Sequence, residues 1–187
     1  MRQVSDFICK FENHLSEQLC DKIVAEYREE EFVRGEHDTP IEVRKLSELM
    51  ISDPEVINKK NSYSRKFMDQ ALFDACGSLL LKYEQETMPI VASEDSGYSL
   101  RKMMKGDHYL QHIDYGAPGS RGASWKLTAS MCLNDEFEGG DFTFFDGQIR
   151  FKLGKGDVLM FPSTFMYPHA VEEITAGERF AVVTWFS

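Results

Sequence analysis

The sequence predicts a single-domain, mainly β (α+β) protein of the sandwich or jelly-roll type, with two helices in its N-terminal half. After residue 97, turn signals recur at intervals of about 8–12 residues between short apolar segments. Before residue 90, two apolar stripes follow helical spacing. A chain of 187 residues with 42% hydrophobic content can bury a substantial core as one domain.

Composition narrows the functional classes. The net charge of −10 argues against nucleic acid or an anionic membrane surface as the main partner, and allows a neutral or basic polypeptide. No Cys-x-x-Cys occurs among the four cysteines, which favours free buried thiols and a reducing compartment. The first residues lack the apolar core of a signal peptide, and no run approaches a membrane span, so a cytoplasmic location is expected.

The N-terminal elements come first along the chain. A short strand is expected over residues 6–11, followed by a helix that Ser16 caps. Residues 28–60 are polar, with a strand over 43–47. A second helix is expected to begin at Asn61 or Ser62 and to pack on the outside of the sheet. Its apolar stripe comprises Phe67, Met68, Ala71, Leu72, Ala75, Cys76, Leu79, Leu80 and Tyr83.

The strands of the C-terminal half follow. A Gly- and Ser-rich loop over residues 115–124 should border the mouth of any site on the preceding strand. The acidic segment 134–141 lacks the ligand order of an EF-hand loop, so it predicts a hairpin turn. A turn at Gly177 should separate the last two strands. The expected strands cover residues 98–103, 109–114, 125–133, 142–145, 148–151, 157–161, 169–174 and 179–186.

His112 and Asp114 carry the chemical signal. Side chains two residues apart point to the same face of a strand, so both can reach one metal ion. Two imidazoles and one carboxylate form the triad of non-haem iron(II) oxygenases, and His169 begins a strand that can supply the second imidazole. A helical zinc pair of His108 and His112 lacks the glutamate that follows the first histidine in metalloproteases.

Arg179 follows His169 by ten positions. By strand periodicity it shares a face with Ala181, Val183 and Trp185. A lone arginine among apolar residues requires an anion, which a metal-bound dicarboxylate would supply.

Several motifs now stand in order. Tyr109-x-x-His112-x-Asp114 is followed by the Leu133-Asn134 to Asp141 hairpin, by the Gly154 to Phe161 strand, and by His169, Arg179 and Trp185. Over residues 97–187 this order resembles the iron(II)/2-oxoglutarate dioxygenases, and within them the prolyl 4-hydroxylase-like group. Asp141-Phe142 departs slightly from that group's Gly-Gly-Glu-Thr. The resemblance implies a double-stranded β-helix, with residues 97–187 as its catalytic core and 1–96 as helical support and substrate loop.

The resemblance also implies the site. Iron(II) would be held by His112, Asp114 and His169, and the distal carboxylate of 2-oxoglutarate by Arg179. Oxygen is the other co-substrate, and ascorbate an optional cofactor. Tyr109 would bind the same carboxylate, but its strand parity is opposite to that of His112, so it requires a bulge. Trp185 would either wall this pocket or belong to the core.

The resemblance favours a prolyl residue of a peptide or protein as substrate. Arg44 and Arg121 are candidate substrate contacts, and the alternative for each is a surface arginine in solvent. A second hypothesis is a hydroxylase of a free amino acid or another small molecule. A closed cavity at the site would favour a small molecule, and an open groove would favour a peptide. A non-catalytic jelly-roll binding module, which would bind no metal, is a third.

Overall fold

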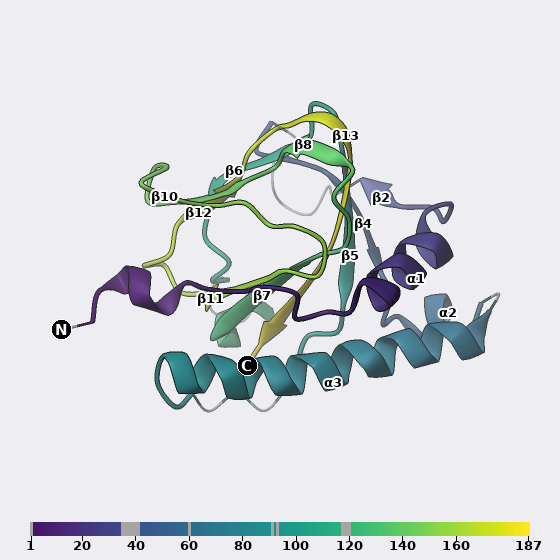
Figure 1. Cartoon of the computed structure of the whole chain (residues 1–187), viewed down its shortest axis with the longest axis horizontal. Coiled ribbons are helices and arrows are strands. Elements are labelled where there is room, and N and C mark those ends of the chain that lie inside the picture. Colours follow the sequence, from purple (N-terminus) through teal and green to yellow (C-terminus); the bar gives the residue numbers. More distant parts are fainter. Residues whose placement is uncertain (1, 35–41, 60, 91, 93, 117–120) are drawn as a thin grey trace.

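The computed structural model describes residues 2–34, 42–59, 61–90, 92, 94–116 and 121–187, and two facing β-sheets form its centre (Figure 1). The larger sheet has the strand order β1-β11-β7-β13-β5-β4-β2, with β8 joined to β13. The smaller has the order β10-β9-β12-β6-β3. Helices α1 and α3 cover the outer face of the larger sheet. This arrangement confirms the predicted jelly roll with N-terminal supporting helices.

The element bounds are as follows. The helices are η1 (Val4–Phe7), α1 (Glu17–Tyr27), α2 (Pro54–Ile57), α3 (Ser62–Glu86) and η2 (Arg121–Ser124). The strands of the N-terminal half are β1 (Cys9–Phe11), β2 (Val33–Arg34), β3 (Arg44–Lys45) and β4 (Ser47–Met50). The remaining strands are β5 (Ser99–Met104), β6 (His108–His112), β7 (Leu127–Cys132), β8 (Phe137–Gly139), β9 (Phe142–Phe144), β10 (Ile149–Phe151), β11 (Val158–Pro162), β12 (His169–Val171) and β13 (Ile174–Phe186).

Both helices form where their stripes predict them. The hydroxyl of Ser16 accepts a hydrogen bond from the Leu19 backbone N–H at 3.2 Å, which satisfies one of the free donors at the start of α1. The buried faces of α1 and α3 meet the outer face of the larger sheet in one apolar cluster. Phe67 is an exception to the predicted buried stripe of α3, because it is 57% exposed. Arg65, two residues earlier, is buried instead. The guanidinium of Arg65 is paired with Glu26 and Glu30.

Two other predicted boundaries were wrong. Only residues 9–11 of the expected first strand pair, with β11, because a 3-10 turn occupies residues 4–7. No turn separates strands at Gly177, since β13 continues from Ile174 to Phe186. Gly177 has a φ of +75°, and a Cβ there would lie 2.1 Å from the Glu136 carbonyl oxygen. This glycine lets β13 leave β8 and continue as the partner of β5 and β7.

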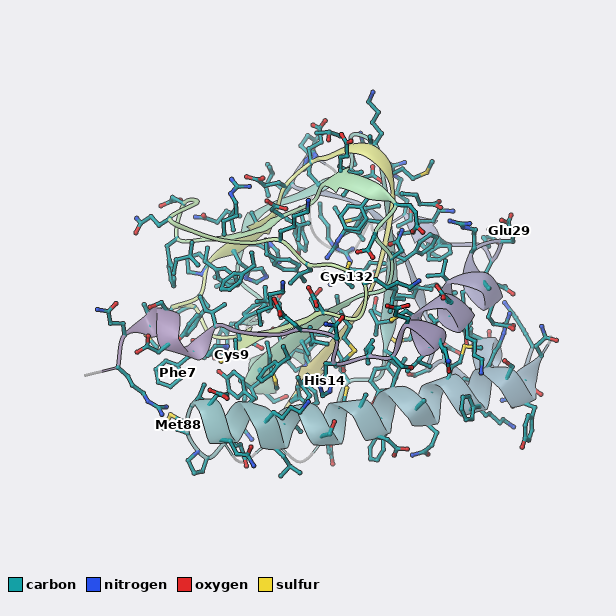
Figure 2. The ribbon with its side chains drawn as sticks, viewed as in Figure 1. Phe7, Cys9, His14, Glu29, Met88 and Cys132 are labelled. Atoms are coloured by element: carbon teal, nitrogen blue, oxygen red, sulfur yellow. The ribbon has the colours of Figure 1, made fainter. Side chains whose placement is uncertain are left out.

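A second apolar cluster fills the space between the sheets. Its members include Met103, Cys132, Phe142, Phe144 and Phe161. Cys132 lies in this interior, whereas His14 lies against α3, where its Nε2 is 2.9 Å from the Ala75 carbonyl oxygen (Figure 2). All four cysteines are free, as predicted. Among the described helices, none combines the length and apolar character needed to cross a membrane.

Candidate active site

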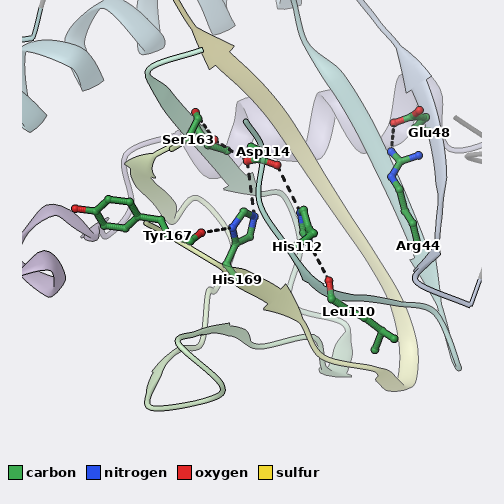
Figure 3. A network of polar contacts seen from close by, with 9 residues as sticks. Arg44, Glu48, Leu110, His112, Asp114, Ser163, Tyr167 and His169 are labelled. Atoms are coloured by element: carbon green, nitrogen blue, oxygen red, sulfur yellow. Dashed lines mark hydrogen bonds and ion pairs between the residues drawn. The ribbon is translucent and has the colours of Figure 1, made fainter. Parts of the chain in front are cut away.

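Two histidines and an aspartate meet where two neighbouring inner strands of the smaller sheet, β6 and β12, end and begin. Strands β6 and β12 pair antiparallel, and His112 lies directly opposite His169. Asp114 lies two residues beyond the end of β6, and its Oδ1 and Oδ2 are 3.5 Å and 3.7 Å from the Nε2 atoms of His112 and His169 (Figure 3). One ligand atom from each residue lies within 4.8 Å of the others, which is close enough to hold one metal ion. His112 and Asp114 therefore reach one point, as their two-residue spacing predicts, although Asp114 lies past the end of β6.

Both imidazoles are oriented by main-chain carbonyl groups. The Nδ1 atom of His112 is 2.9 Å from the carbonyl oxygen of Leu110, and that of His169 is 3.0 Å from that of Tyr167 (Figure 3). When each Nδ1–H donates to its carbonyl, each Nε2 presents a lone pair to the centre. Burial lowers the pKa of His169 to about 4, although the negative charge of Asp114 acts to raise it. The imidazole is therefore neutral at pH 7 and available as a ligand.

The carboxylate of Asp114 is held by a hydroxyl relay from the larger sheet. Thr128 Oγ1–H donates to Asp114 Oδ2 at 2.7 Å, and Ser163 Oγ lies 2.8 Å from Thr128 Oγ1. Burial by itself would raise the pKa of Asp114, but His169, His112 and Thr128 outweigh it and hold that pKa well below its usual range. Two imidazole nitrogens and a carboxylate oxygen fit the facial triad that binds iron(II) and leaves positions open for other ligands.

Tyr109 reaches the metal side of its strand through an irregularity. His169 pairs with His112 and Val171 pairs with Tyr109, so the register shifts by one residue between the two pairs. The Tyr109 ring stacks on the His112 ring, with centroids 3.4 Å apart and planes at 8°. The bulge that its parity requires is therefore present.

Arg179 is an unpaired cation in the interior. It is 3% exposed, and its Nε and Nη2 atoms have no hydrogen-bond partner within the described part of the chain. Its Nη1 lies 3.7 Å from Met103 Sδ, and its Cζ lies within 6 Å of the ring centroids of Phe137 and Phe142. A buried guanidinium without an acceptor is suited to bind a carboxylate that enters from outside the chain.

A cavity lies beside the metal-binding residues. It has a volume of about 750 Å³, and Tyr109, Asp114, Trp125 and Trp185 are among its lining residues, whereas Arg179 is not. Trp185 stacks on Trp125, with centroids 4.3 Å apart and planes at 10°. The side chain of Trp185 therefore forms part of the wall of this cavity, and it is not among the described side chains that contact Arg179.

Arg44 also lines the cavity, so the alternative of a surface arginine in solvent does not hold. It is 6% exposed, and its Nη2 donates to Glu48 Oε2 at 2.5 Å (Figure 3). Strand β3 carries it inward because Arg44 pairs with Tyr109 of β6. Arg121 begins the short helix η2, and its side chain lies outside the described residues.

Sequence reasoning missed two groups of residues in this region. Arg101 lines the cavity from β5, and Thr128 and Ser163 hold Asp114. The sequence signal for Arg101 is weak, because by strand periodicity it shares its face with Ser99 and Met103, which is not a purely apolar face. Thr128 and Ser163 lie in strongly apolar segments, where a hydroxyl gives no sequence signal of the residue it will meet.

The C-terminal half matches a known family. Residues 98–187 match the model of the 2OG-Fe(II) oxygenase superfamily. A PKHD-type hydroxylase from Prochlorococcus marinus (strain MIT 9215) is 34% identical over 91 residues, which are 48% of this chain and 40% of the relative. Another from Acinetobacter baumannii is 49% identical over 82 residues, or 40% of this chain and 35% of the relative. The match therefore spans well under half the length of these curated relatives.

Solved structures are similar over nearly the whole chain. A Pseudomonas putida prolyl-4-hydroxylase has a TM-score of 0.71 at 20% identity, covering 96% of this chain and 91% of that one. A Trichoplax adhaerens prolyl hydroxylase, in complex with a peptide fragment of the oxygen degradation domain of hypoxia inducible factor, has a TM-score of 0.75 at 16% identity. It covers 97% of this chain and 84% of its own. At these identities the likeness establishes the fold.

Proposed function

We propose that this chain, whose residues 98–187 match the 2OG-Fe(II) oxygenase superfamily, is a member of that superfamily and a 2-oxoglutarate-dependent hydroxylase. The observation that carries the proposal is the convergence of His112, Asp114 and His169 on one point. The unpaired guanidinium of Arg179 is buried in the same region, because Phe142 contacts both Arg179 and His169. The first three side chains would hold iron(II), and the fourth would bind the distal carboxylate of 2-oxoglutarate. This division of roles explains why a buried arginine persists without a partner of its own.

Each residue contributes a physical task. Leu110 and Tyr167 fix the two imidazoles through their carbonyl oxygens, and the Thr128 hydroxyl fixes the orientation of Asp114. Iron(II) with 2-oxoglutarate, when bound, supplies the oxygen activation and the oxidation of a substrate C–H bond, with succinate and CO2 as by-products. The aromatic side chains around Arg179 exclude water, so that its attraction for a carboxylate is less screened than at the surface.

Two substrate classes are proposed. A prolyl residue of a peptide or protein is supported by the prolyl hydroxylases that share this fold, one of them in complex with a peptide fragment. A free amino acid or another small molecule is supported by the cavity of about 750 Å³ that borders Asp114, because small-ligand sites commonly measure about 300–1,000 Å³.

The test of the enzyme is succinate formation from 2-oxoglutarate by the purified protein with iron(II). His112→Ala and Asp114→Ala should abolish turnover and weaken metal binding while far-UV circular dichroism is unchanged. His108→Ala is the matched control, because His108 lies on the same strand and its Nε2 is bonded to the Glu42 carbonyl oxygen. Wild-type protein that neither binds iron(II) nor forms succinate would favour a non-catalytic binding module, and full activity in either ligand variant would refute the assignment.

A further inference from the structure

The cavity beside the metal-binding residues contains a second unpaired guanidinium. Arg101 lies on β5, between Glu48 of β4 and Ala181 of β13 in the larger sheet. Its Cζ lies 5.4 Å from the ring centroid of Trp185 and 5.9 Å from that of Tyr109. These two rings restrain the guanidinium and remove it from bulk water, which is an orientation suited to recognition.

One donor of the Arg101 guanidinium group is buried and left unsatisfied by the described residues. Its Nε is buried without an acceptor, and no ion pair of Arg101 is found among the described residues. Its neighbour Arg44 differs, because that guanidinium is bonded to Glu48. Burial lowers the pKa of Arg101 and the nearby charge of Arg44 lowers it further, whereas Glu48, Tyr109 and Asp114 act in the opposite direction. An anion placed beside Arg101 would further offset its burial and its repulsion from Arg44.

The carboxylates that line the cavity are bonded to other groups. Glu48 Oε2 accepts from Arg44 at 2.5 Å and from Ser99 at 3.4 Å. Asp53 Oδ1 accepts from the Glu55 backbone N–H at 2.7 Å, at the start of α2. Asp114 faces the two histidines and accepts from Thr128. The acceptor for Arg101 is therefore expected to come from a bound molecule.

The co-substrate accounts for only one of the two guanidiniums. A 2-oxo diacid that chelates the metal through one end has a single carboxylate left, and Arg179 is proposed to bind it. Arg179 lies opposite Met103 on the paired strands, and its contacts are Met103, Phe137 and Phe142. Arg101 instead contacts the two aromatic rings of the cavity. Two separate sites thus require two anionic groups.

The rest of the cavity wall indicates what else the molecule carries. Trp125 and Trp185 form a flat apolar wall. Val33, Met50 and Ile113 also line the cavity, and their side chains are exposed. Trp185 Nε1 is also buried without a hydrogen-bond partner among the described residues. An apolar body beside these rings would leave its polar end at Arg101.

We infer that Arg101 binds a carboxylate of the primary substrate, and that the substrate is a small carboxylic acid with an apolar body, such as a free amino acid. The inference rests on the proposed hydroxylase function and chooses between its two substrate classes. An internal residue of a peptide has no carboxylate on its main chain, so it would leave Arg101 unpaired. Arg101 would fix which carbon of the acid faces the metal, as a bidentate guanidinium does for carboxylates.

The chain provides its own reporter for the test. Its only two tryptophans, Trp125 and Trp185, both line the cavity, so intrinsic tryptophan fluorescence reports on occupancy without any metal. The probes are proline, valine, leucine, isoleucine and phenylalanine, each compared with its own amide. At least one acid should give a saturable fluorescence change, and its amide should not. Arg101→Met should weaken that binding about 10- to 100-fold, the loss expected for a charged hydrogen-bonded pair.

Matched variants separate this role from a structural one. Arg101→Lys keeps the charge but not the planar fork, so it should fall between wild type and Arg101→Met. Arg150→Met makes the same chemical change at an exposed ion pair on β10 and should bind the acids as wild type does. In turnover, Arg101→Met should require more of the acid for half-maximal rate. Its requirement for the co-substrate should not rise.

Four results would overturn the inference. They are equal binding of acid and amide, no saturable change with any of the five acids, an increased co-substrate requirement in Arg101→Met, and hydroxylation of a blocked prolyl peptide but of none of the acids. Each of these leaves succinate formation intact, so it is distinct from failure of the proposed function. Conversely, acids that bind through Arg101 in a protein that never forms succinate would refute only the hydroxylase.

Discussion

The ring of Tyr109 lies flat on the ring of His112, with centroids 3.4 Å apart and planes at 8°. In a regular strand, residues three apart point to opposite faces. The one-residue shift in the pairing of β6 with β12 removes that difference and brings both rings to the same side. The stack limits rotation of the imidazole, and Tyr109 is in turn covered by the guanidiniums of Arg44 and Arg101.

If the ring of Tyr109 positions His112, replacing Tyr109 should act on the metal. Tyr109→Ala removes the stack, which is worth about 0.5–1.5 kcal/mol beyond simple burial, so we expect manganese(II) to bind up to about tenfold more weakly. Tyr109→Phe keeps the ring and should bind manganese(II) as wild type does. The measurement is a calorimetric titration of the metal-free protein. Equal weakening in both variants would show that the hydroxyl, and not the ring, supports the site.

The Thr128 hydroxyl is expected to tune metal affinity through Asp114. Thr128→Val keeps the shape of the side chain but removes the donor to Asp114 Oδ2. Loss of such an outer partner typically weakens metal binding about 10- to 100-fold. Thr143→Val, at a buried position of β9 in the smaller sheet, is the control for the same chemical change. If the two variants bind manganese(II) equally well, the relay through Thr128 has no role in holding the metal.

Arg179→Met should change stability and co-substrate binding in opposite directions. Removing an unpaired buried charge in favour of an apolar side chain of similar length should raise the free energy of unfolding of the metal-free protein by about 1–4 kcal/mol. The same change removes the proposed carboxylate partner, so the co-substrate concentration needed for half-maximal rate should rise at least about tenfold. Urea unfolding and succinate assays measure the two effects. A lower stability together with an unchanged co-substrate requirement would assign Arg179 a purely structural role.

The comparison with the sequence predictions separates local from long-range information. The capped helix after Ser16, the convergence of His112 and Asp114, and the burial of Arg179 follow from spacing along one segment, and the structure has all three. The sequence left open whether Arg44 is buried, because its burial depends on pairing with Tyr109, far away in sequence. The contact of Thr128 with Asp114 likewise depends on how the two sheets face each other, which no local pattern encodes.

Gly177 illustrates a further limit of local signals. A glycine between two apolar segments predicts a turn, because glycine readily adopts the positive φ that many tight turns require. Here the positive φ bends one long strand at the point where its partners change. Up to Gly177, β13 pairs with β8, and from Glu178 onward it pairs with β5 and β7. Turn and bend use the same residue and the same dihedral angle, so only the position of the neighbouring strands distinguishes them.

Asp157 should make the attachment of the N-terminal strand dependent on pH. Its Oδ2 accepts from the Gly154 backbone N–H at 2.9 Å and lies 2.9 Å from Lys10 Nζ, and its Oδ1 accepts from the Asn13 backbone N–H at 3.1 Å. Burial raises the pKa of this carboxyl, but the hydrogen bonds from Gly154, Lys10 and Asn13 outweigh it and lower that pKa below its usual value. A depressed pKa in the folded state stabilises the fold above the unfolded-state pKa, about 3.9, and this contribution is lost as the pH falls through the folded-state value.

Asp157→Asn should therefore lower the free energy of unfolding at pH 7 by about 1.5–3 kcal/mol and differ less from wild type at pH 3. Urea unfolding followed by far-UV circular dichroism measures this, with the exposed turn residue Asp146, as Asp146→Asn, for control. A deficit in Asp157→Asn that is equally large at pH 7 and at pH 3 would show that the carboxylate charge contributes nothing to holding β1 on β11.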